Sequence, residues 1–197
     1  MSAPRIAVLG LGNLMRVDDA VGMLAIEAMR ADPRLPASIH LIEGGTLGLE
    51  LLQPLEGTTH LLVLDAIDAG AAPGTLLRFA GDALADLPGG KSVHLLGFTD
   101  LIGAMRLMGT VPGQIVVLGV QPKRIAWGTE LSSTVEAALP RLLQAALAQI
   151  EVWTGPEGGL AEKAPDPCRA RPAASTVAQS ASVNLQAAAS GESGWYW

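Results

Sequence analysis

Short apolar runs alternate with longer amphipathic segments along the first 153 residues of the chain. A strand inside a parallel sheet is buried on both faces, so its sequence is a continuous run of apolar residues. Strands that alternate with helices favour a sheet that is covered by helices on both faces. We therefore predict an α/β fold with three layers around a mostly parallel sheet. Its strands are expected at residues 5–9, 39–42, 60–65, 75–79 and 114–120, and the run at 75–79 is expected at an edge.

Apolar residues at helical spacing predict the helices between these strands. The first helix is expected to begin with Asp18 as its N-cap and to end before Pro33. A short helix through residue 52 and a longer one around residues 98–105 are expected to follow.

The last helix is predicted from about residue 133 to residue 151. Ser133-Thr-Val-Glu136 matches a capping box, which satisfies free backbone N–H groups at a helix start. Pro140 lies inside this segment and is expected to bend or split the helix, because proline removes a backbone donor.

Residues 154–197 differ in composition from the rest of the chain. They are rich in Ala, Ser, Gly and Pro and contain few branched aliphatic residues. Such a segment buries too little apolar surface to offset the entropy lost on ordering. We predict one folded domain over residues 1–153 and a flexible, low-complexity tail over residues 154–197.

Charge and cysteine content exclude several classes of function. Thirteen basic and 19 acidic residues give a net charge of −6, which disfavours binding to nucleic acid or to an anionic membrane through bulk charge. No apolar run approaches the roughly 18 residues that a membrane-spanning helix needs. The single cysteine, Cys168, excludes an internal disulfide and a zinc site of the CxxC type. The N-terminus has no signal-peptide pattern, so a cytoplasmic location is expected.

The loop after the first strand begins Gly10-Leu-Gly12-Asn13. A strand followed by Gly-x-Gly suggests dinucleotide binding, but Met15 stands where that fingerprint needs its third glycine. We therefore expect no organic cofactor. The glycines still allow sharp turns and close backbone contact.

Polar residues follow the strands where parallel sheets bind their ligands. Asp18 and Asp19 could simply cap a helix, whereas Asp65 ends a strand that is otherwise apolar. Asp68 is a weaker candidate, and His94 lies in a later loop or helix start. Two carboxylates and one imidazole could bind Zn²⁺ or Ni²⁺ with open positions, or act as general acid and base on water.

Five segments together resemble the maturation endopeptidases of [NiFe]-hydrogenases. They occur in the same order as in that family, with similar gaps, and the resemblance spans about residues 5–150. The segments are VLGLGN at 8–13, DDAVG at 18–22, EGGTLG at 43–48, VLDAID at 63–68 and SVHLLGFTD at 92–100.

The resemblance implies a mixed five-stranded sheet and a specific activity. The family removes a C-terminal extension from the hydrogenase large-subunit precursor after nickel insertion. Its metal-contacting residues correspond to Asp19, Asp65 and His94, although the family often has glutamate at the first position. Nickel would be supplied by the precursor, which would be the partner. The loops with Gly12 and Asn13, and with Gly44, Gly45 and Thr46, would shape the groove for the precursor's tail.

Two other functions fit the same residues. The chain could be a non-catalytic, nickel-sensing chaperone of the precursor, or a zinc metallohydrolase of similar topology. The residues also leave open whether nickel activates water or whether Asp19 or Asp65 does so as a base.

Overall fold

The structure is a computed structural model that describes residues 3–81 and 93–155, without the side chains of residues 93–96. Nearly all of the predicted tail, from residue 156 on, lies outside the described residues. None of the helices in the described ranges is long and apolar enough to cross a membrane.

The centre of the fold is a five-stranded sheet with the order β2-β1-β3-β5-β4. The first four strands in this order run parallel, and β4 pairs antiparallel with β5 at the edge. The mixed, mostly parallel sheet and the edge position of β4 confirm the predicted fold class. The strands are β1 (Ile6–Leu11), β2 (His40–Gly45), β3 (His60–Ala66), β4 (Leu76–Ala80) and β5 (Gln114–Val120).

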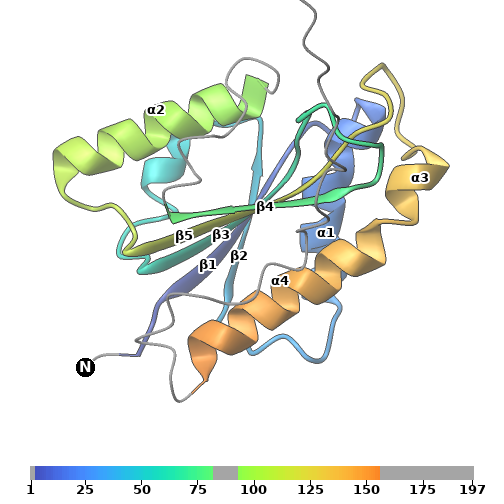
Figure 1. The fold of residues 1–197 in the computed structure, drawn as a ribbon. Coiled ribbons are helices and arrows are strands. Elements are labelled where there is room, and N and C mark those ends of the chain that lie inside the picture. Colours follow the sequence, from blue (N-terminus) through green and yellow to red (C-terminus); the bar gives the residue numbers. More distant parts are fainter. Residues whose placement is uncertain (1–2, 82–92, 156–197) are drawn as a thin grey trace, which may run out of the picture.

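Helices cover both faces of the sheet, and two short 3₁₀ helices lie in the loops after β1 and β2 (Figure 1). Helices α1 and α4 lie on one face, and α2 lies on the other (Figure 1). The bounds are η1 (Val17–Ala20), α1 (Val21–Arg30), η2 (Leu49–Leu52), α2 (Val93–Met108), α3 (Ser133–Glu136) and α4 (Leu139–Thr154).

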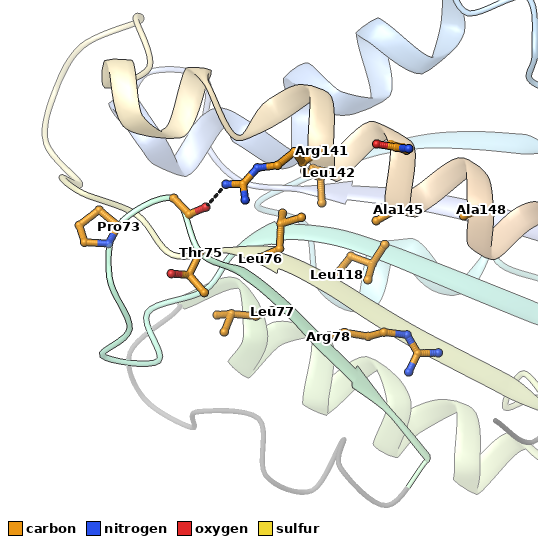
Figure 2. Close-up of a pocket in the computed structure, with 12 residues that line it drawn as sticks. Pro73, Thr75, Leu76, Leu77, Arg78, Leu118, Arg141, Leu142, Ala145 and Ala148 are labelled. Carbon is orange, nitrogen blue, oxygen red and sulfur yellow. Dashed lines mark hydrogen bonds between the residues drawn. The ribbon is translucent and has the colours of Figure 1, made fainter. Parts of the chain in front are cut away.

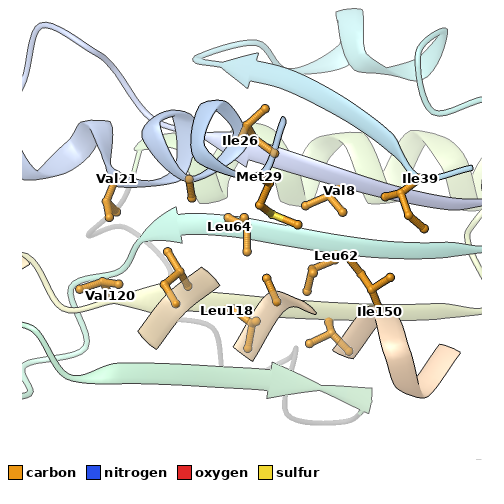
Figure 3. Close-up of a cluster of buried hydrophobic side chains, with 14 of the residues drawn as sticks. Val8, Val21, Ile26, Met29, Ile39, Leu62, Leu64, Leu118, Val120 and Ile150 are labelled. Atoms are coloured by element: carbon orange, nitrogen blue, oxygen red, sulfur yellow. The ribbon is translucent and has the colours of Figure 1, made fainter. Parts of the chain in front are cut away.

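Alternate residues of the central strands supply two separate apolar cores. Leu62 and Leu64 of β3 point to the face under α1 and α4, where they meet Ile26 and Ile150 (Figure 3). Leu61 and Val63 point to the opposite face and pack with residues of η2 and α2. Burial on both faces explains why these strands are continuously apolar in the sequence.

Three details of the predicted helices are corrected or confirmed. Asp18 is not an N-cap: it lies inside η1, and α1 begins only at Val21. The capping box is also wrong, since Ser132 is the N-cap of α3 and makes no side-chain capping bond. The predicted split at Pro140 is confirmed, because α3 ends at Glu136 and Pro140 occupies the first turn of α4.

Candidate active site

Asp65 lies near the carboxyl end of β3, opposite Gly119 of β5. Its carboxylate is fully buried, and Oδ1 accepts a hydrogen bond of 2.8 Å from the backbone N–H of Ala66. Because side chains alternate along a strand, Asp65 shares its face with Leu61 and Val63, which is the face covered by α2. The carboxyl ends of the parallel strands form one edge of the sheet. A buried carboxylate there faces the place where open α/β sheets bind their ligands.

Asp19 is brought to the same edge by the loop that follows β1. Its side chain is 5% exposed, and Oδ2 accepts a hydrogen bond of 3.2 Å from the backbone N–H of Asn13. Gly12 has a φ of 124°, and a Cβ at that position would collide with the carbonyl oxygen of Asp19. Glycine at position 12 therefore lets the loop fold directly onto Asp19.

Asp18, the neighbour of Asp19, has a structural role. Its carboxylate is fully buried and accepts backbone N–H bonds from Lys123, Arg124 and Ser132, and a fourth bond from the Ser132 hydroxyl. These four bonds tie η1 to the loop after β5. The charge of Asp18 is thus satisfied inside the protein, whereas sequence reasoning assigned this residue to a helix cap.

The segment that carries both aspartates is held in a strained conformation. Val17 has a φ of 47°, which a β-branched residue rarely adopts. Its backbone N–H donates to the carbonyl of Gly128 at 2.9 Å, and Arg16 forms a β-bridge with the same glycine. The loop after β5 thereby fixes the backbone just before Asp18 and Asp19.

His94 is the second residue of α2, and its side chain lies outside the described residues. α2 is followed by β5 and crosses the sheet so that its first turn lies at the edge where β1, β2 and β3 end (Figure 1). The backbones of Gly97 and Gly48 approach closely, since a Cβ on Gly97 would lie 3.6 Å from the Cα of Gly48. This contact sets the start of α2 beside the loop after β2.

The predicted groove residues lie in the loop after β1 and at the end of β2. Gly44 and Gly45 are the last two residues of β2 rather than part of a turn, and Thr46 follows them. The N–H of Gly12 donates to the carbonyl of Gly45 at 2.9 Å. Gly44 lies at a register shift between β1 and β2, where a Cβ would press against Leu9. Thr46 is exposed. The loop after β1 and the end of β2 therefore form one connected rim, as a groove beside Asp19 requires.

The loop after β3 is held by Gln121, a residue that sequence reasoning missed. Gln121 is buried, and its Oε1 accepts N–H bonds from Ala69 and Ala71 at 2.9 and 3.1 Å. Its Nε2 donates to Oδ1 of Asp68 at 3.0 Å. Asp68 thus takes part in the bonding of its own loop. A polar residue directly after the apolar strand β5 was the one sequence signal for Gln121.

A cavity of about 710 Å³ lies elsewhere, between the edge strand β4 and α4. Figure 2 shows Leu76, Leu118 and Leu142 around it, with Arg141 bonded to the carbonyl of Gly74 at 2.8 Å. None of the predicted site residues lines this cavity. Its lining contains no carboxylate, histidine or cysteine, so the carboxyl ends of the strands remain the better candidate for the active site.

The structure brings Asp19, Asp65 and the backbone of His94 to one edge of the sheet. Two buried carboxylates there can accept a proton from water or bind a divalent cation. Among the described side chains, which do not include that of His94, no group of three His, Cys, Asp or Glu residues could hold a metal ion. That Asp19, Asp65 and His94 together bind a metal ion stays a prediction.

Known proteins match this chain in sequence and in fold. The sequence profile of a family described as "Hydrogenase maturation protease" matches residues 23–149. That range covers well over half of the chain. The chain belongs to the hydrogenase maturation protease family. The matched range includes Asp65 and His94 but begins after Asp19.

Individual members of the family agree with this assignment. A "Hydrogenase 2 maturation protease" of Escherichia coli is 35% identical over 148 residues, which is 74% of this chain and 90% of the relative. A hydrogenase expression/formation protein HupD of Rhodobacter capsulatus is 36% identical over 152 residues, or 76% of this chain and 72% of the relative.

A solved structure supports the fold as well as the family. The hydrogenase maturating endopeptidase HybD from Escherichia coli superposes with a TM-score of 0.71 at 34% identity, covering 75% of this chain and 92% of HybD. These maturation proteases confirm two expectations from the sequence, the family resemblance and the assignment as a peptide hydrolase.

Proposed function

We propose that this maturation protease removes the C-terminal extension of a [NiFe]-hydrogenase large-subunit precursor after nickel has been inserted. The observation that carries the proposal is that Asp19, Asp65 and the start of α2 all lie at the carboxyl ends of the parallel strands (Figure 1). Relatives named as hydrogenase maturation proteases support the class of substrate.

Nickel would act in this proposal as part of the substrate. A protease that offers an incomplete set of ligands gains binding free energy only when the substrate brings the ion. A precursor without nickel would lack that contribution and would be bound more weakly. Asp19, Asp65 and His94 are the residues proposed to contact the ion.

The reaction is hydrolysis of one peptide bond. The oxygen of a water molecule attacks the scissile carbonyl carbon while a carboxylate, Asp19 or Asp65, accepts a proton from that water. The carbon–nitrogen bond then breaks, and the leaving amine takes up a proton. A buried carboxylate suits this work, because its surroundings are already fixed before the substrate arrives.

The connected rim formed by the loop after β1 and the end of β2 would hold the extension. Gly12 and Gly45 are bonded to each other, and Gly44 leaves no side chain between the strands. Backbone groups along this rim could pair with an extended peptide. Asn13 and Thr46 would add polar side chains to the same groove.

The proposal is tested with purified protein and a nickel-loaded precursor, whose products are weighed by mass spectrometry. The wild type should shorten the precursor by a C-terminal peptide. Asp65→Asn and His94→Ala should abolish this loss while circular dichroism shows that both variants stay folded. Asp100→Asn, an exposed acid on α2, is the matched control and should cut normally. Cleavage at the wild-type rate by both site variants would contradict the site.

The remaining expectations from the sequence stay predictions. They are a cytoplasmic location, nickel as the ion brought by the precursor, no organic cofactor, and no binding of nucleic acid. The zinc metallohydrolase alternative would be supported by a stoichiometric metal in the purified protein.

A further inference from the structure

Two loops beside the site expose apolar and basic side chains together. The loop after β5 carries Trp127, which is 83% exposed, and Ile125, which is 38% exposed. The loop after β1 carries Met15, which is 52% exposed. A contiguous group of exposed apolar side chains indicates an interaction site, and Trp, Met and Arg are the residues that protein interfaces favour. We call this surface the Trp127 face: Met15, Arg16, Lys123, Arg124, Ile125 and Trp127.

The backbone of the Trp127 face is rigid although its side chains are exposed. Gly128 donates to the carbonyl of Met15 at 3.0 Å and accepts from the N–H of Val17 at 2.9 Å. Asp18 fixes the N–H groups of Lys123 and Arg124 at 2.8 Å each. An aromatic side chain on a fixed backbone loses little conformational entropy on binding, so it is suited to act as an anchor.

The face lies on the same edge of the sheet as the proposed site. The parallel strands β1, β3 and β5 are neighbours, so the loops after β1 and β5 flank the end of β3 that carries Asp65. The loop after β1 also holds Asn13, whose N–H donates to Asp19. A protein whose C-terminal segment reaches the aspartates would therefore meet the Trp127 face with its folded part.

Charge indicates the kind of surface that fits. The chain has a net charge of −6, yet this face presents Arg16, Lys123 and Arg124. Within the described ranges, ion pairs join Arg30 with Glu43 and Arg34 with Asp32, and none involves these three cations. A local basic rim around an exposed tryptophan is complementary to an apolar patch that is bordered by carboxylates.

We infer that the Trp127 face docks the folded body of the precursor, with an apolar contact at Trp127 and carboxylates opposite Arg16, Lys123 and Arg124. This inference rests on the proposed function and adds a second contact to it. Nickel at the site would distinguish a loaded precursor from an unloaded one, and a specific protein interface, which buries about 800 Å² on each partner, would distinguish this precursor from other proteins. Docking outside the groove would supply that selectivity.

The test measures affinity and cleavage separately. Trp127→Ala should raise the KM for nickel-loaded precursor at least tenfold and leave kcat within twofold, and its urea midpoint should equal that of the wild type. In the cleavage-deficient Asp65→Asn background, Trp127→Ala should raise the Kd by the same factor. Lys123→Glu with Arg124→Glu should also raise the Kd, and should weaken its dependence on salt.

Leu107→Ala is the matched control, since Leu107 is 93% exposed near the end of α2, away from the site. It should change neither KM nor Kd.

A KM for Trp127→Ala within twofold of the wild type would overturn the docking surface while leaving the protease function intact. Failure of the wild type to cut would instead contradict the proposed function, and the Kd would still report on docking. A dimer in sedimentation that Trp127→Ala dissociates, with an unchanged Kd for precursor, would assign the face to a second copy of the chain and overturn the inference.

Discussion

The carboxylate of Asp18 binds both hydrogen-bond donors of Ser132, a residue 114 positions later in the chain. Oδ1 accepts the backbone N–H at 2.7 Å and Oδ2 accepts the hydroxyl at 2.9 Å. This pair closes the loop after β5 over η1 and fixes the segment that also carries Asp19. The two adjacent aspartates therefore have different roles. Asp18 joins η1 to the loop after β5, and Asp19 lies at the candidate site.

Asp18→Asn should destabilise the protein by about 2–4 kcal/mol, because a buried acceptor of four hydrogen bonds would be replaced by a neutral amide with N–H groups facing donors. Urea unfolding measures the change. Asp100→Asn, at an exposed position of α2, should leave the urea midpoint unchanged. Equal stability of the two variants would contradict the role of Asp18.

Asp19→Asn should cost much less stability than Asp18→Asn but should reduce cleavage at least a hundredfold. The amide oxygen can still accept the bond from Asn13, whereas the negative charge needed at the site is lost. Asp19→Glu keeps the negative charge and introduces the glutamate that the family often has at this position. This variant should therefore cut within about tenfold of the wild-type rate. The rates come from mass-spectrometric time courses. Full activity of Asp19→Asn would remove this residue from the site.

Gly22→Ala should destabilise the protein by about 3 kcal/mol or more. A Cβ at this position would collide with the carbonyl oxygens of Leu11 and Leu64, so α1 could no longer rest on β1 and β3. Gly103→Ala is the control, since Gly103 lies in α2 with no heavy atom within 4 Å of such a Cβ. It should stabilise the helix by about 0.5–1 kcal/mol. Thermal and urea unfolding of both variants test the contrast.

Stability should fall as the pH drops below the usual histidine pKa of 6.5. Burial lowers the pKa of His60, which packs edge-on against Trp153 at 5.2 Å. Between the lowered pKa and 6.5 the unfolded chain binds more protons than the folded one, so acid favours unfolding. His60→Gln should reduce this loss of stability between pH 7.5 and pH 5, measured by urea unfolding. His40 is exposed, so His40→Gln should show the same loss of stability as the wild type. If the stability of His60→Gln depends on pH as that of the wild type does, His60 is not its source.

The sheet could be predicted because each central strand is buried on both faces. The apolar run at residues 114–120 coincides with β5, and the run at 60–65 is only one residue shorter than β3. The helix starts were predicted less well, because side chains that commonly cap helices made long-range bonds here. The Ser132 hydroxyl donates to Asp18 and makes no capping bond at the start of α3, although Ser132 is the N-cap residue, and Asp18 lies inside η1.

The candidate site could be predicted in part, from residues that follow strands. Asp65 stands out because a carboxylate ends an apolar strand, and the topology puts Asp19 on the same edge. Gln121 could not be found in this way. Gln121 accepts hydrogen bonds from the backbone N–H groups of Ala69 and Ala71, about 50 residues earlier in the chain. Such long-range contacts leave no local pattern in the sequence.

The central claim is that the site recognises a precursor by the nickel it carries. The direct measurement mixes the purified protein with the same precursor, prepared with and without nickel, and weighs the products over time. The nickel-loaded precursor should lose its C-terminal peptide, and the nickel-free one should stay at full length. Equal cleavage of both precursors would contradict it.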